Sequence, residues 1–159
     1  FERRVLAALI VAGGCYVAYT WGSNDVANAV GVIAGGGVIS VNAALLIGGA
    51  AIVIGVMTWG YKVIETIGSQ IVHLLPLMAF CAQLASALNV HMYSLLGMPV
   101  STSHSIVGAI IGVGLVRGMK MINVAIVREI MLCWLVTPLV SGLISYVLLL
   151  LLRAVVHVV

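Results

Sequence analysis

Charged residues are scarce in this chain. Only 7% of its 159 residues are charged, whereas 64% are hydrophobic, and the mean hydropathy is +1.29. Because soluble domains carry about 25% charged residues, this composition excludes an ordinary soluble domain and predicts an integral membrane protein. The long apolar runs lack the period-two alternation of membrane β-strands, so the predicted fold is all-α. At about 20 residues per span, we expect one transmembrane domain over residues 1–159, with about five to six membrane segments.

Cysteine and histidine are too few and too dispersed to form a metal centre or a disulfide framework. Three cysteines lie far apart in apolar sequence, which is typical of small buried side chains. Four histidines form no zinc-binding motif, so we expect no resident cofactor. The net charge of +3 comes from basic residues that mostly flank apolar runs. This placement is typical of residues that set membrane orientation, and it predicts a lipid bilayer rather than nucleic acid as the partner.

One polar cluster interrupts the first apolar run. Asn24, Asp25 and Asn28 have the spacing of residues that share one face of a helix. Their carboxylate and carboxamide oxygens are hard ligands that suit a compact cation. Because an ionisable residue at membrane depth marks a functional site by default, we interpret the cluster as a cation site. The alternative is a packing face of small residues and amides between helices. The glycine-rich stretch Val30–Ser40 is expected to break this helix.

A second polar cluster follows a proline. Ser101, Thr102 and Ser103 come at the expected start of a helix, where such residues are favoured. The apolar segment Ser105–Val116 after them reaches only about 18 Å as a helix, too short for a hydrocarbon core of about 30 Å. We therefore expect a re-entrant helical hairpin whose N-terminus, with three hydroxyls and free N–H groups, binds an oxyanion. The alternative is an ordinary N-cap. His104 is expected to orient its neighbours or to serve as an accessory site residue.

Two further stretches carry polar residues. Tyr61–Leu75 alternates polar and apolar residues and is expected to form a short amphipathic helix that ends at Pro76. Glu65 within it is either an accessory site residue or an interfacial carboxylate paired with Lys62. In the next apolar run, polar residues recur at every third position and are expected to face inward: Gln83, Ser86 and Asn89.

The C-terminal part is predicted to be structural, with two helices, Met121–Val136 and Leu139–Leu152, separated by Pro138. The chain thus has two interrupted helical regions with opposite ligand preferences, which indicates the midplane site of a secondary transporter rather than an enzyme. A serine hydrolase that pairs Ser103 with His104 is disfavoured, because adjacent residues on a helix point about 100° apart.

The two polar clusters also carry a family resemblance. Two stretches closely resemble the signature motifs of the inorganic phosphate transporter (PiT) family: Gly22-Ser23-Asn24-Asp25-Val26-Ala27-Asn28-Ala29 and Pro99-Val100-Ser101-Thr102-Ser103-His104. Tyr61–Gly68 resembles the segment that follows the first motif in the family's second half. The resemblance implies cation-coupled symport of inorganic phosphate, with Na⁺ or, in some members, H⁺ as the coupling ion. It implies the following site: Asn24, Asp25 and Asn28 for the cation, and Ser101, Thr102 and Ser103 for phosphate.

Members of this family contain two such halves in inverted orientation, whereas this chain contains one copy of each motif. The resemblance therefore implies one unit of an inverted-repeat transporter, most like the C-terminal half, in the plasma membrane. The second repeat would come from another chain, an inverted homodimer or the rest of a longer protein. A channel-like or auxiliary subunit without coupled transport, and a transporter of another oxyanion such as sulfate, stay open as alternatives.

Overall fold

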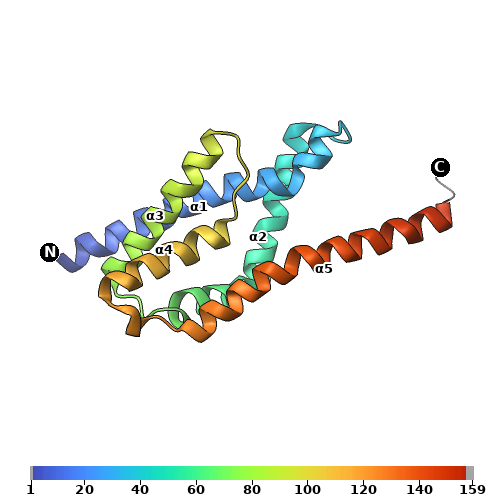
Figure 1. Ribbon diagram of the computed structural model, residues 1–159. Helices are drawn as coiled ribbons and strands as arrows, with labels where there is room; N and C mark the ends of the chain where they lie inside the picture. The colour runs from blue at the N-terminus through green and yellow to red at the C-terminus, as the bar shows by residue number, and fades with distance from the viewer. Residues whose placement is uncertain (1, 157–159) are drawn as a thin grey trace. The chain divides into compact units, whose positions relative to one another are not determined.

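The computed structural model describes residues 2–156 and confirms the all-α fold. In chain order the helices are α1 (Glu2–Gly35), α2 (Val41–Glu65), a π-helical turn η1 (Thr66–Gln70), α3 (Pro76–Leu95), α4 (Thr102–Arg117), a 3₁₀ turn η2 (Met119–Met121) and α5 (Val124–Val156) (Figure 1). The chain divides into two compact units, residues 1–122 and residues 123–159. The first holds α1 to α4, and the second holds α5.

Within residues 2–156, three helical stretches are long and apolar enough to cross a membrane: Glu2–Gly35, Val41–Gln70 and Val124–Ala154. Thr102–Arg117 is apolar but shorter. Its 16 residues reach about 24 Å at 1.5 Å per residue, less than the hydrocarbon core of about 30 Å. These lengths agree with an integral membrane protein that crosses more than once. The total of five to six segments, the re-entrant course of α4 and the inverted repeat stay predictions.

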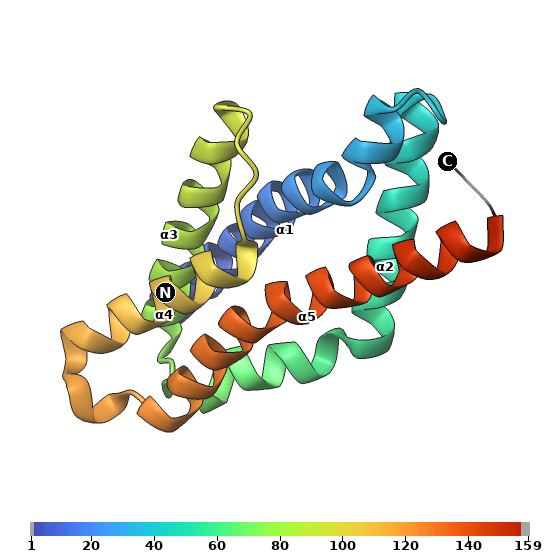
Figure 2. The ribbon, with the colours of Figure 1, turned by 45° about the vertical axis from the view of Figure 1, so that its right-hand side comes forward.

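The packed centre of the first unit is made by α1, α3 and α4. α3 crosses α1 and also packs against α4 (Figures 1 and 2), whereas α4 meets α1 at only a few positions. α2 packs against the C-terminal half of α1. The apolar side chains buried in this unit are small or aliphatic, and they include Ala44, Ile71, Val72, Ala82, Ala87, Val90, Ile106, Val107 and Ile110. Small residues allow close helix approach in a membrane, where apolar contact gains little over lipid. This packing places the second polar cluster beside the first.

The first polar cluster lies within α1, which continues through it without interruption. The helix reaches Gly35, and the chain turns at Gly36 and Gly37, where Gly37 adopts a φ of 71°. Glycine is favoured there because it has no Cβ. The predicted break within Val30–Ser40 is therefore correct only for its second half. A helix in lipid keeps its backbone hydrogen bonds even where glycine weakens it, because no water can replace them.

The predicted short amphipathic helix at Tyr61–Leu75 is wrong. α2 continues through the start of this region and then passes directly into η1. Two hydroxyls satisfy carbonyls at the transition: Thr66 Oγ1 donates to Lys62 O at 3.1 Å, and Ser69 Oγ donates to Glu65 O at 2.6 Å. The polar residues therefore mark the end of a long helix rather than a helix of its own.

Pro76 and Pro138, which were expected to end or separate helices, do not do so. Pro76 instead begins α3, where its missing N–H costs nothing. Pro138 lies inside α5, so the two predicted C-terminal helices are one. Hydroxyls support the surrounding turns: Thr137 Oγ1 donates to Cys133 O at 2.7 Å, and Ser141 Oγ donates to Thr137 O at 2.8 Å. Such bonds help a membrane helix to tolerate the hydrogen bond that proline cannot make.

Gly48→Ala is expected to destabilise the first unit. A Cβ at this position would lie 2.6 Å from Cγ1 of Val30 and 3.2 Å from Cγ1 of Val26, and both are stiff β-branched side chains. α1 and α2 would have to separate, at a cost of about 1–3 kcal/mol for overpacking. Gly49→Ala is the matched control, because a Cβ there meets nothing within 4 Å. Thermal unfolding in detergent should show a lower midpoint for Gly48→Ala alone; equal midpoints would contradict this close packing.

Candidate functional site

The first polar cluster faces two different neighbours. Asn24 and Asn28 lie four residues apart on one side of α1, where Asn28 Nδ2 donates to Asn24 Oδ1 at 2.9 Å. Asp25 is one residue further round the helix, about 100° from Asn24. Asn24 is 5% exposed, Asp25 is partly buried, and Asn28 is exposed. The three predicted cation residues are therefore adjacent, but their side chains are divided between two surroundings.

The carboxylate of Asp25 meets the N-terminus of α4. Thr102 Oγ1 donates to this carboxylate, at 3.2 Å from Oδ2 and 3.4 Å from Oδ1. Thr102 is the first residue of α4 and is buried, with 8% of its surface exposed. Free N–H groups and the positive end of the helix dipole favour an anion at this point. A predicted cation residue and a predicted phosphate residue, 77 positions apart in the chain, are thus in direct contact.

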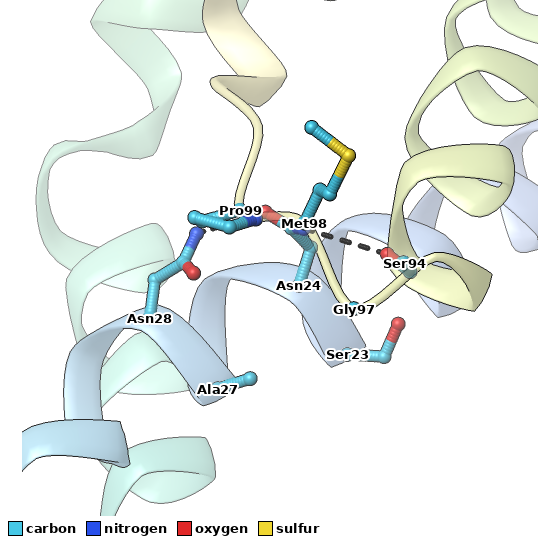
Figure 3. Close-up of a pocket in the computed structure, with 8 residues that line it drawn as sticks. All are labelled: Ser23, Asn24, Ala27, Asn28, Ser94, Gly97, Met98 and Pro99. Atoms are coloured by element: carbon cyan, nitrogen blue, oxygen red, sulfur yellow. Dashed lines mark hydrogen bonds between the residues drawn. The ribbon is translucent and has the colours of Figure 1, made fainter.

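Asn24 and Asn28 line a pocket of about 400 Å³ between α1 and the segment that joins α3 to α4 (Figure 3). Its lining residues are all uncharged: Ser23, Asn24, Ala27, Asn28, Ser94, Gly97, Met98 and Pro99. Asn24 Nδ2 donates to Ser94 Oγ across the pocket at 3.4 Å. Carboxamide and hydroxyl oxygens can coordinate a small cation, and the N–H and O–H groups can hydrogen-bond an oxyanion. The pocket therefore presents groups of the chemistry that suits either kind of ion.

The end of α3 shapes this pocket. Gly97 adopts a φ of 69°, Gly97 N donates to Ser94 O at 3.1 Å, and Met98 N donates to Tyr93 O at 2.9 Å. This pattern is a glycine C-cap, which ends the helix and turns the chain. Ser94 in the last turn was not predicted as a site residue. A lone serine in an apolar helix has no spacing that distinguishes it from structural serines.

The other residues of the second cluster have different surroundings. Ser101 is the N-cap of α4, as the sequence had suggested for an ordinary helix start. Its Oγ accepts from His104 N at 3.3 Å and lies 2.5 Å from His104 Nδ1. His104 is thereby an orienting neighbour of the cap. Ser103 is exposed. Among the described residues, Thr102 is the one member of the Ser-Thr-Ser run whose hydroxyl is hydrogen-bonded to α1.

Glu65, the other accessory candidate, is exposed at the end of α2. It does not line the pocket beside Asn24. The ammonium group of its neighbour Lys62 lies 5.9 Å from the centroid of the Tyr61 ring, within the range of a cation–π contact. An accessory role for Glu65 stays a prediction.

Comparison with known proteins gives consistent matches. A family model described as the phosphate transporter family matches residues 2–145. A Chlamydia pneumoniae protein named "Putative phosphate permease" is 40% identical over 164 residues, which cover 98% of this chain and 38% of the relative. A Pyrococcus abyssi protein of the same name is 47% identical over 141 residues, which cover 82% and 35%. A solved structure described as "The sodium-dependent phosphate transporter" is 38% identical, with a TM-score of 0.71, over 84% of this chain and 36% of that chain.

The chain spans only 35% to 38% of the length of these two curated relatives. The family match nevertheless includes both polar clusters and all of α1 to α4. The family resemblance of the two motifs is thereby confirmed, and this chain belongs to the phosphate transporter family.

Proposed function

We propose that this chain supplies one repeat of a cation-coupled symporter of inorganic phosphate, with Na⁺ or H⁺ as the coupling ion. The contact between Asp25 and Thr102 is the observation that carries the proposal, because it brings a residue of each polar cluster together. Membership of the phosphate transporter family supports it, as does the similarity to a structure described as a sodium-dependent phosphate transporter. The second repeat would come from another chain, an inverted homodimer or the remainder of a longer protein, in the plasma membrane.

Electrostatics provides the coupling. Asp25 places a carboxylate at the helix N-terminus where phosphate would bind. Two unit charges about 4 Å apart repel by about 4 kcal/mol at an effective dielectric constant of about 20. Phosphate therefore binds poorly until a cation neutralises the carboxylate. Na⁺ would be held by Asp25, with the carboxamide oxygens of Asn24 and Asn28 as further ligands once their side chains turn from the pocket toward Asp25. H⁺ would instead sit on the carboxylate itself.

Once the carboxylate is neutralised, the N-terminus of α4 can accept phosphate. The hydroxyls of Ser101, Thr102 and Ser103 and the free N–H groups of the first turn would donate hydrogen bonds to it. Each ion then increases the affinity for the other by the same factor, because coupling between sites is reciprocal. Movement of one repeat against the other would expose the site alternately to the two sides.

Uptake of labelled phosphate by proteoliposomes that contain the purified chain tests this function. We expect saturable uptake that an inward Na⁺ gradient stimulates, or that an inward H⁺ gradient stimulates if H⁺ couples. Excess unlabelled sulfate should not compete; competition would contradict the assignment of phosphate. Uptake that rises linearly with phosphate and ignores both gradients would indicate a channel-like subunit instead.

Binding provides the second arm of the test when the chain requires a partner for transport. Labelled phosphate binding to the detergent-solubilised chain should strengthen with Na⁺ or with added protons, and the coupling ion's own affinity should strengthen equally with phosphate. A folded chain that shows neither uptake nor coupled binding would contradict the proposal.

Ser94→Ala is expected to weaken Na⁺-dependent phosphate binding by roughly 2–10-fold if Na⁺ is the coupling ion. The variant removes the hydroxyl that accepts from Asn24 Nδ2, and a neutral hydrogen bond contributes about 0.5–1.5 kcal/mol, with 1.4 kcal/mol equal to tenfold. Ser94→Thr retains the hydroxyl and is the matched control. The measurement is the Na⁺ concentration that gives half-maximal phosphate binding. Equal values for the two variants would exclude Ser94 from the site.

A further inference from the structure

A network of hydrogen bonds joins α3 to α4 about one turn after the N-terminus of α4. Ser105 Oγ accepts from Asn89 Nδ2 at 3.0 Å and from Ser86 Oγ at 3.2 Å, and it donates to Ser86 O at 3.2 Å. A serine hydroxyl can accept two hydrogen bonds and donate one. All three hydrogen bonds are made here, and all three partner atoms belong to α3. Ser86 is only 1% exposed, so the network lies in the packed interior between α3 and α4.

Beyond Ser105 along the helix, α4 packs against its surroundings through apolar side chains. The buried side chains that follow Ser105 in α4 are aliphatic: Ile106, Val107 and Ile110. Apolar contact does not depend on direction, and in a membrane it competes with lipid. Such contacts hold α4 beside α3 but determine its rotation only weakly. The three hydrogen bonds of Ser105 therefore constrain how α4 is turned about its own axis.

The rotation of α4 decides whether Thr102 reaches Asp25. Ser105 follows Thr102 by three positions, and residues at this spacing lie on neighbouring parts of one helix face. The bond from Thr102 Oγ1 to Asp25 Oδ2 is already 3.2 Å long. A hydroxyl hydrogen bond is lost beyond about 3.5 Å, so a small rotation of α4 breaks it.

We infer that Ser105, held by Asn89 and Ser86, is a positioning residue that aims Thr102 at Asp25. The inference concerns the arrangement of α4, and only its transport readout rests on the proposed function. Ser86 and Asn89 were expected from their spacing to face inward, and the network gives that face a role. Neither residue contacts the two polar clusters directly through these bonds.

Disulfide trapping measures this arrangement without any transport. In a background with the three native cysteines replaced by alanine, Asp25→Cys and Thr102→Cys together should crosslink rapidly under mild oxidation. Adding Ser105→Ala should slow crosslinking about tenfold, and Ser105→Thr should restore it. Ser141→Ala is the matched control, because its hydroxyl bonds to its own helix, at Thr137 O.

A second variant separates positioning from stability. Ser105→Ala alone leaves buried donors unpaired, which costs stability, whereas removal of both partners is close to neutral. The combination of Ser105→Ala with Ser86→Ala removes both serine hydroxyls of the network and leaves only Asn89, which is partly buried. This double variant should therefore unfold near the wild-type temperature and yet crosslink as slowly as Ser105→Ala. Crosslinking at the wild-type rate in this folded double variant would overturn the inference. The inference would also be overturned if the protein with Asp25→Cys and Thr102→Cys failed to crosslink while Ser105 is intact.

Phosphate uptake gives the functional consequence. Ser105→Ala and the double variant should raise the phosphate KM about tenfold and change the maximal rate less, because binding geometry is lost while the rest of the transport cycle is retained. A fall in maximal rate with an unchanged KM would contradict the positioning role. If wild-type chain shows neither uptake nor coupled binding and crosslinking still responds as expected, the proposed function fails while the positioning of α4 by Ser105 stands.

Discussion

Asp25→Asn is expected to abolish the Na⁺ dependence of phosphate uptake and most of the uptake itself. The amide keeps the shape of the side chain but removes the charge that attracts the cation and repels phosphate. Without a bound cation the Na⁺ gradient no longer drives accumulation, so uptake against a phosphate gradient should fall by about 5–150-fold, the usual range of coupling factors. Phosphate binding in detergent should persist and become independent of Na⁺, because the repulsive charge is gone.

The control for this substitution is Glu129→Gln, which neutralises an exposed acid in α5. It should keep both the rate of uptake and its response to the gradient. Na⁺-stimulated uptake at the wild-type rate in Asp25→Asn would exclude Asp25 as the coupling residue. A coupling ion of H⁺ predicts a related pattern, in which Asp25→Asn removes the dependence of uptake on the proton gradient.

Thr102→Val is expected to lower phosphate affinity by about 10–100-fold. Valine has nearly the shape of threonine but cannot donate to Asp25 or to phosphate. Hydrogen bonds to charged groups contribute about 1.5–3 kcal/mol, and each 1.4 kcal/mol is tenfold. Thr102→Ser keeps the hydroxyl and should stay within a few-fold of wild type. The measurements are the phosphate KM in uptake and the Kd of labelled phosphate at saturating coupling ion.

Thr137→Val provides a comparison of the same chemistry outside the site, since the Thr137 hydroxyl bonds within α5 to Cys133 O. Its phosphate KM should equal that of wild type. If Thr102→Val leaves both the KM and the gradient response unchanged, the contact between Asp25 and Thr102 does not carry coupling. The site would then have to be assigned to the pocket beside Asn24.

Some local features of the site could be predicted from spacing alone. Asn24 and Asn28 are four residues apart, which places them on one helix face, and the 2.9 Å bond between their side chains agrees with this. Ser101 was a favoured residue for a helix start and is the N-cap of α4. Both predictions rest on the fixed geometry of one helix, which is the same in any surroundings.

Helix ends were harder to predict in this chain. Proline and polar residues end helices in water, where exposed backbone groups bond to solvent. Here Pro138 lies inside α5, and the polar residues near Tyr61 extend α2. In lipid the backbone must bond to itself or to nearby hydroxyls, so hydroxyls such as those of Thr66 and Thr137 help to support the helices at these points.

The sequence by itself determined that this is a helical membrane protein of the phosphate transporter family, and it identified the two polar clusters. Composition is a property of the whole chain, and the motifs lie within single short segments, so neither requires a tertiary contact. Only the tertiary structure decided that Asp25 contacts Thr102, that Asn24 contacts Ser94, and that Ser105 is held by Asn89. The first two pairs are 77 and 70 positions apart, and the rotation of one helix against another depends on packing between such distant residues. Periodicity along a helix specifies which side chains share a face, but not which partner that face meets.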